Sequence, residues 1–138
     1  MRRVTVFFYG LFMSEELLKR RGLNPTNRRM TEVENFEIHV GKRASLLPKI
    51  GSSVWGIAFD LSAEEVTALY SEPAVADYRP EAVLARSARG EVFAALCYNT
   101  DPSNDSIADQ AYLEKLIEIA TNEELPPAYL VLLSRLRN

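Results

Sequence analysis

The segment Val4–Ser14 constrains the fold of this chain more than any other. Residues 3–9 are rich in β-branched and aromatic side chains and predict a buried strand. Gly10 follows, and Ser14 is a plausible N-cap, so the chain is expected to turn sharply into a short helix over residues 15–21. Such a turn directs backbone N–H groups and the positive end of a helix dipole at one point. The segment therefore suits the binding of a carboxylate or a developing oxyanion.

The size and composition of the chain predict one globular domain over residues 1–138. Its apolar fraction of 47% is enough for a core without disulfides, and its net charge of −3 argues against a nucleic-acid partner. No apolar run reaches the ~20 residues of a membrane span, and the basic N-terminus lacks a signal-peptide cleavage site. Cys97 is the single cysteine, so a reducing, cytoplasmic location is expected. One cysteine and one histidine cannot build a usual zinc site, and we expect no metal.

Strand signals dominate the middle of the chain. Short strands are expected at residues 28–33, 36–40 and 44–47, because asparagine, glycine and proline punctuate these runs. Residues 54–61 form a stronger strand signal, in which Gly56 indicates a bulge or a close backbone contact. A hairpin is expected over residues 81–99.

Helix signals follow these strands. Ser62 and Glu65 form a capping box, and the helix that they open is expected to end at Pro73. A later helix is expected to start at Ser106, and a final one at Pro126-Pro127. No repeat or linker interrupts the elements, so they predict a single α+β domain.

Glu72 is the strongest candidate for chemistry. The sequence has no Gly-x-Ser-x-Gly, no P-loop and no dinucleotide fingerprint, which leaves acid/base catalysis by a carboxylate. Glu72 stands before Pro73, among residues whose apolar side chains would bury it and raise its pKa toward neutrality. The alternative is a solvated glutamate at a helix end. Downstream, Arg79 could clamp a carboxylate, or form an ion pair with Asp77 or Glu81.

Taken in order, these segments resemble the γ-glutamylcyclotransferase-like family. Residues 7–11 (FFYGL) are similar to its opening strand and tyrosine–glycine loop, and residues 54–61 (VWGIAFDL) to its central strand. Leu69 and Glu72, with Tyr78 and Arg79 downstream, are similar to the region of the catalytic glutamate. Residues 125–129 (LPPAY) are similar to a leucine–proline–x–x–tyrosine segment, so the resemblance spans residues 4–133.

The resemblance implies a small mixed β-barrel or strongly curved sheet flanked by helices, with a cavity between the loop and the glutamate. It implies an enzyme that needs no cofactor. The partner would be a small molecule with a γ-glutamyl or similar carboxylate group, cyclised to 5-oxoproline with release of an amine or amino acid. Glu72 would be the catalytic acid/base. The implied substrate-binding residues are Tyr9, Gly10, Leu11, Phe12, Tyr78, Arg79 and Tyr129.

The loop also departs from the family pattern. Many members have serine or asparagine after the tyrosine–glycine pair, where this chain has Leu11 and Phe12. Backbone donors survive this change, but side-chain donors do not. Tyr70 also stands where the family often has an aspartate. The alternative interpretation is therefore a non-catalytic small-molecule-binding or regulatory module on the same fold.

Overall fold

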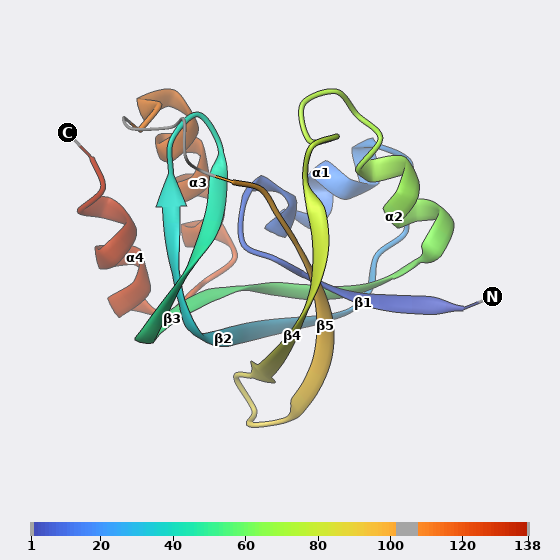
Figure 1. Cartoon of the computed structure of the whole chain (residues 1–138), viewed down its shortest axis with the longest axis horizontal. Helices are drawn as coiled ribbons and strands as arrows, with labels where there is room; N and C mark the ends of the chain where they lie inside the picture. Colours follow the sequence, from blue (N-terminus) through green and yellow to red (C-terminus); the bar gives the residue numbers. More distant parts are fainter. Residues whose placement is uncertain (1, 102–107, 138) are drawn as a thin grey trace.

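Within residues 2–101 and 108–137, which the computed structural model describes, five strands form a closed barrel in the order β1-β3-β2-β4-β5 (Figure 1). A short 3₁₀ helix and several α-helices surround the barrel. The predicted α+β fold, a small barrel flanked by helices, is confirmed. The strands are β1 (Arg3–Phe8), β2 (Thr26–Val40), β3 (Ala44–Ser62), β4 (Arg79–Ser87) and β5 (Val92–Asn99). The helices are η1 (Leu11–Met13), α1 (Glu15–Arg20), α2 (Ala63–Leu69), α3 (Gln110–Asn122) and α4 (Pro127–Ser134).

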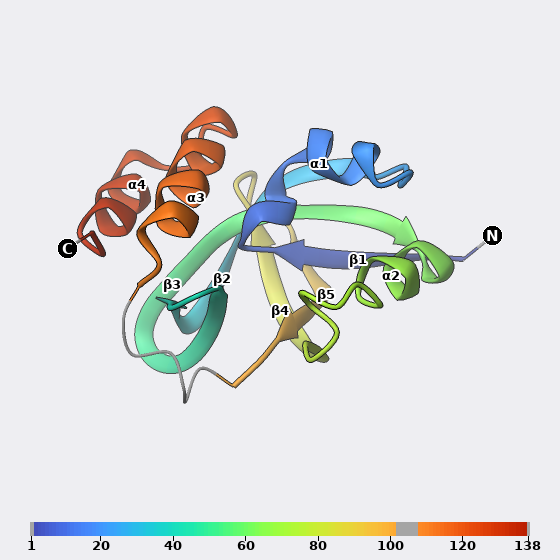
Figure 2. The same cartoon turned by 90° about the horizontal axis from the view of Figure 1, so that it is seen from above.

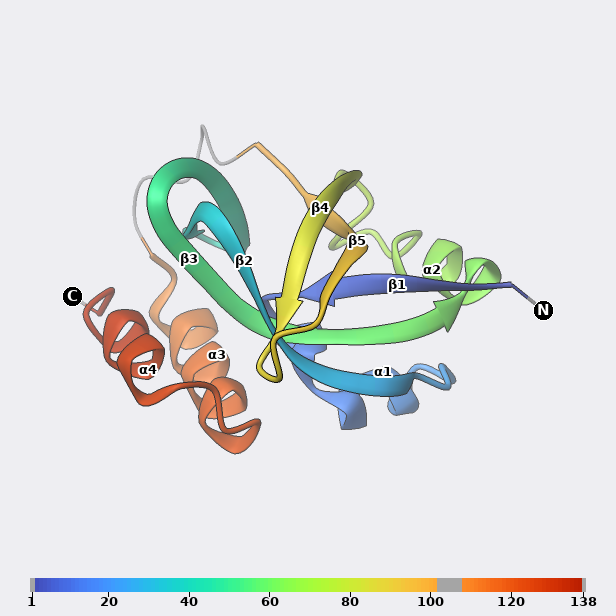
Figure 3. The same ribbon diagram turned by 90° about the horizontal axis from the view of Figure 1, so that it is seen from below.

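The long, curved strand β3 holds the barrel together. Its second half pairs antiparallel with β1, from Arg3 opposite Ser62 to Phe8 opposite Ile57, and β2 pairs along its other edge. Strand β5 runs parallel to β1 on the opposite side. Figures 2 and 3 show the result: β2 and β3 bend toward α3 and α4, while α1 and α2 lie near the other end of β3.

The three short strand signals before residue 48 belong to two long strands. The predicted break at residues 41–42 is confirmed, because β2 ends at Val40 and β3 begins at Ala44, but the breaks at Asn35 and Pro48 are wrong. Asn35 lies inside β2, where it adopts a left-handed φ of 70° at a shift in the β2–β3 register. Pro48 lies inside β3, opposite Phe36. Both residues are accommodated because this irregularity bends the ladder without ending it.

Helix α2 ends earlier than predicted. The capping box is confirmed, with the Glu65 amide donating to Ser62 Oγ at 3.1 Å. The last helical residue is Leu69, however, and Pro73 lies beyond it. Tyr70 is the C-cap, and its ring stacks on Tyr98 of β5. Glu72 therefore lies in the turn that follows the helix.

Helix α3 has a different cap from the expected one. Ser106 lies outside the described residues. The N-cap is Asp109, whose side chain accepts a hydrogen bond from the Tyr112 amide at 3.0 Å. Asp109 is as good a capping residue as serine.

Gly56 makes the close backbone contact that its position predicted. A Cβ atom there would lie 2.1 Å from the carbonyl oxygen of Phe8 and 3.0 Å from the ring of Phe7. No side chain fits this space. The glycine therefore lets β1 lie directly against β3 just before the Tyr9–Gly10 turn.

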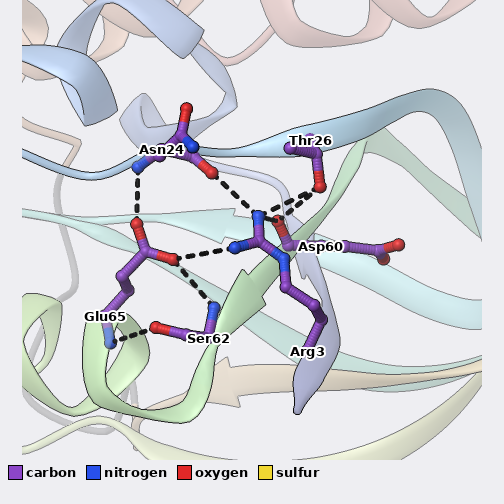
Figure 4. A network of polar contacts seen from close by, with 6 residues as sticks. All are labelled: Arg3, Asn24, Thr26, Asp60, Ser62 and Glu65. Carbon is purple, nitrogen blue, oxygen red and sulfur yellow. Dashed lines mark hydrogen bonds and ion pairs between the residues drawn. The ribbon is translucent and has the colours of Figure 1, made fainter. Parts of the chain in front are cut away.

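A polar network around Arg3 fixes the start of β1 (Figure 4). One guanidinium nitrogen donates to the carbonyls of Asn24 and Asp60, each at 2.8 Å, and to Thr26 Oγ1 at 3.0 Å. The other nitrogen forms an ion pair with Glu65 at 3.4 Å. Arg3 thus joins β1, β2, β3 and α2.

The side chain of Asp60 makes a second cluster of contacts, which predicts a pH dependence of stability. Its carboxylate accepts hydrogen bonds from Thr5 at 2.7 Å, Asn27 at 3.0 Å and Arg29 at 2.7 Å. Partial burial would raise the pKa of Asp60, but the bonds from Asn27 and Thr5 and the charge of Arg29 outweigh it and hold the pKa below its usual value. A lowered folded-state pKa adds stability above the unfolded-state pKa, and this stability is lost as the pH falls through the folded-state pKa.

Asp60→Asn is therefore expected to lose about 1–2 kcal/mol of unfolding free energy at pH 7, and progressively less as the pH falls below about 4. Urea unfolding of both proteins from pH 7 down to pH 2 measures this difference. Glu64→Gln, at an exposed position on α2, is the control and should change little. A loss that stays constant across this pH range would contradict the assignment.

Candidate functional site

A cavity of about 280 Å³ lies between the turn after β1 and the turn after α2. Arg21, Arg43, Tyr98 and Tyr112 also line it, from the end of α1, the start of β3, β5 and α3. Segments far apart in the sequence thus meet around one hollow.

Half of the residues that line this cavity are aromatic. They are Phe7, Phe8, Tyr9, Phe12, Tyr70, Tyr78, Tyr98 and Tyr112. Tyr70 is the centre of the group: its ring stacks on that of Tyr98 with centroids 3.9 Å apart and planes at 9°, and meets Phe12 edge-on at 6.2 Å. Tyr78 lies on another side of the same ring, at 6.4 Å.

Two of the tyrosine hydroxyls are used by the framework. Tyr9 Oη donates to the carbonyl of Tyr98 at 2.9 Å, and Tyr78 Oη donates to the carbonyl of Ala44. Burial raises the pKa of Tyr9 and of Tyr70 above the ordinary value, so both phenols are neutral. Tyr9 and Tyr78 therefore contribute rings to the cavity while their hydroxyls hold strands together.

The turn at Gly10 presents the start of η1 to the cavity. The first helical bonds run from Met13 N to Gly10 O at 3.1 Å and from Ser14 N to Leu11 O at 3.2 Å. The backbone of Leu11 hydrogen-bonds to Tyr112. The amide of Phe12 also precedes these donors, which is the usual position of an open N–H group at a helix start.

The hydroxyl of Tyr112 lies against this turn. A Cβ atom on Gly10 would be 3.1 Å from Tyr112 Oη, so glycine leaves room for the hydroxyl. Burial raises the pKa of Tyr112, while the backbone of Ala44 and Leu11 and the charge of Arg43 act in the opposite direction. Sequence reasoning missed Tyr112, because no local pattern connects α3 to the first turn of the chain.

Glu72 lines the cavity, but in different surroundings from those expected. Its side chain is 37% exposed, and Oε2 accepts a hydrogen bond from Arg21 Nε at 2.9 Å. The Arg21 guanidinium also lies over the ring of Phe12, 5.0 Å from its centroid. The expectation of an apolar, buried carboxyl group is therefore wrong, because Arg21 at the C-cap of α1 reaches it across the cavity mouth.

Arg43 is a second cation that the sequence did not single out. Its guanidinium makes two hydrogen bonds to the carboxylate of Asp77, at 2.6 and 2.8 Å, and one to the carbonyl of Ala74 at 2.8 Å. These bonds to Arg43 hold the pKa of Asp77 well below its usual value. The guanidinium lies 5.0 Å from the centroid of Tyr78 and fixes the turn that carries Glu72.

Two of the predicted site residues do not line the cavity. Arg79 Nη1 donates to the carbonyls of Ala76 and Tyr78, at 2.8 and 3.0 Å, and so braces the end of the turn. Tyr129 is buried on α4, beside the backbone of Trp55. The lining does include Tyr9, Gly10, Leu11, Phe12, Glu72 and Tyr78.

Clustered metal ligands and membrane-spanning helices are both missing from residues 2–101 and 108–137. No group of three or more His, Cys, Asp or Glu side chains that could hold a metal occurs in the described part of the chain. Nor does any helix there have the length and apolar character needed to cross a bilayer.

Comparison with known proteins gives a family and a fold. The sequence model of the AIG2-like family matches residues 53–133, more than half of the chain. No curated protein matches. Among solved structures, a γ-glutamyl cyclotransferase has a TM-score of 0.81 at 16% identity, over 96% of this chain and 87% of that one. An uncharacterized human protein gives 0.80 at 16% identity, over 97% and 88%.

YkqA from Bacillus subtilis gives a TM-score of 0.79 at 20% identity, over 98% of this chain but 54% of its own length. This chain therefore corresponds to about half of YkqA. At these identities the structural matches establish a shared fold.

Proposed function

Because this chain belongs to the AIG2-like family, we propose that it is an enzyme of the γ-glutamylcyclotransferase type. It cyclises a γ-glutamyl group to 5-oxoproline and releases an amine or amino acid. The observation that carries the proposal is that Glu72 and the Tyr9–Gly10 turn line one cavity. Such a pairing puts an acid/base group opposite backbone hydrogen-bond donors.

In the proposed reaction the substrate attacks itself. Its α-amine forms a bond to the γ-carbonyl carbon, and the γ-amide C–N bond breaks. Because the nucleophile is already attached, the enzyme gains most by holding the substrate folded. A cavity of about 280 Å³ with rigid aromatic walls supports such a role.

Glu72 supplies the proton transfers. The α-amine is protonated at neutral pH, so it must lose a proton before it attacks, and the leaving nitrogen must gain one. One carboxylate can perform both steps. Arg21 bonds to Oε2 and orients the group, and we assign the transfers to Oε1.

The turn after β1 supplies the electrostatic stabilisation. Backbone N–H groups of Gly10, Leu11 and Phe12 would hold the α-carboxylate or the oxyanion of the tetrahedral intermediate. Tyr112, whose hydroxyl lies against Gly10, can add its O–H proton to the same group. Tyr9 and Tyr78 shape the wall. The replacement of polar residues by Leu11 and Phe12 does not affect the backbone donors.

The proposal includes no cofactor, because neither proton transfer nor amide cleavage here needs one. It also includes a cytoplasmic location, because a γ-glutamyl metabolite and a lone cysteine fit a reducing compartment.

The test is release of 5-oxoproline from a panel of γ-glutamyl amines and γ-glutamyl dipeptides, measured by mass spectrometry. We expect release from at least one member in proportion to protein concentration. If no member yields 5-oxoproline, the enzymatic proposal is rejected.

A binding module on the same fold is the second candidate, and the apolar side chains of Leu11 and Phe12 on the cavity lining favour it. Thermal stabilisation by 5-oxoproline or glutamine, without turnover of any γ-glutamyl compound, would support the module.

A further inference from the structure

The positive charges around the cavity are already paired. Of the described residues that line it, Arg21 and Arg43 are the cations. Arg21 is bonded to Glu72, and Arg43 is bonded through two nitrogens to Asp77. A further carboxylate entering the cavity would have to displace one of these partners or lose its hydration without compensation, and both are costly.

The proposed substrate already uses the open donors of the site. The turn at Gly10 offers its N–H groups to an anionic group of the γ-glutamyl part. A leaving amino acid would bring a second carboxylate. No cation that the structure describes on the lining is left to receive it.

The rest of the lining suits an aromatic group. Tyr9 and Tyr78 direct their hydroxyls to backbone carbonyls, which leaves their rings on the cavity. Tyr70 and Tyr98 stack face to face, Phe12 meets Tyr70 edge-on, and all three rings line the cavity as one aromatic wall. Aromatic side chains arranged in this way pack favourably against another ring.

We infer that the substrate is a γ-glutamyl amide whose leaving group is an arylalkylamine without a carboxylate or other further charge, and not a γ-glutamyl amino acid. This inference rests on the proposed function. It specifies what that function leaves open, namely the chemistry of the group that departs.

The test compares γ-glutamyl phenethylamide with γ-glutamyl-phenylalanine, which differ by a single carboxylate. We expect kcat/KM for 5-oxoproline release to be at least about tenfold higher for the phenethylamide. The ratio does not depend on the fraction of active enzyme. Equal values, or a preference for γ-glutamyl-phenylalanine, would overturn the inference while the proposed function stands.

A variant of the wall tests the cause of the preference. In Tyr98→Arg the guanidinium plane can stack on Tyr70 as the tyrosine ring does, and it adds a cation to the cavity. The preference for the phenethylamide should then fall at least about threefold. Tyr98→Met is the matched control, because methionine is close to arginine in length but has no charge. It should not shift the kcat/KM ratio toward γ-glutamyl-phenylalanine. The same fall in both variants would contradict the argument from charge.

If neither compound releases 5-oxoproline, the proposed function is rejected for these two compounds. The charge argument can then still be tested by binding. Isothermal titration of the two compounds then decides. Binding of the phenethylamide at least about tenfold tighter supports the discrimination against a second carboxylate on which the inference rests, and equal binding or none overturns it.

Discussion

Glu72→Gln is expected to lower kcat for 5-oxoproline release by about 10²–10⁴-fold, the largest effect that we predict for a single substitution at the site. Glutamine has the shape of glutamate and can still accept the hydrogen bond from Arg21 Nε. It cannot accept the proton of the α-amine. The loss should therefore appear in kcat, with KM and thermal stability close to those of the wild type.

Glu64→Gln is the matched control, because Glu64 is an exposed glutamate on α2 outside the cavity lining. It should retain wild-type rates. Wild-type kcat in Glu72→Gln would remove Glu72 from the mechanism and require another group to move the protons.

Gly56→Ala is expected to lower the free energy of unfolding by at least about 3 kcal/mol. The new methyl group would lie 2.1 Å from the carbonyl oxygen of Phe8, so β1 and β3 must move apart at the middle of the barrel. Backbone atoms cannot rotate away as a flexible side chain can. Urea unfolding monitored by circular dichroism measures the loss.

Gly22→Ala is the control for a general effect of replacing glycine. Gly22 has a φ of 82°, and no atom lies within 4 Å of the position that an added methyl group would take, so only the left-handed backbone conformation is penalised. We expect a loss of about 1–2 kcal/mol there. Similar losses at the two positions would show that β1 and β3 tolerate separation at Gly56.

The sequence predicts best those features that neighbouring residues determine. Ser14 caps α1 and the Ser62–Glu65 capping box opens α2, because both signals lie within one helical turn. Gly56 indicates a close contact because glycine weakens the interior of a strand and is typically found there where another backbone approaches closely. The order of the family motifs also predicts the barrel.

The pairing of charges at the site was not predictable in the same way. Arg21 and Glu72 are 51 residues apart, and Arg43 and Asp77 are 34 apart. Each pair joins the turn after α2 to a segment that only the barrel fold brings beside it, the end of α1 or the start of β3. Sequence reasoning therefore assigned Glu72 to apolar surroundings and overlooked the arginine beside it.

Pro73 shows a related limit. The proline restricts Glu72, but the helix already ends at Leu69, and the next residue, Tyr70, packs its ring on Tyr98 of β5. A contact of this kind, between residues 28 positions apart, is not visible to a local stop signal. The early end of α2 matters for function, since it leaves Glu72 in a turn that Arg43 and Arg21 hold in position.

The position of β1 in the barrel has a consequence for biosynthesis. Strand β1 lies between β3 and β5, whose pairing residues come more than 45 residues later in the chain. Its apolar run must wait, without a hydrogen-bonding partner, until the second half of β3 has been translated. Nascent chains stalled before β3 are therefore expected to depend on chaperones that shield this first segment.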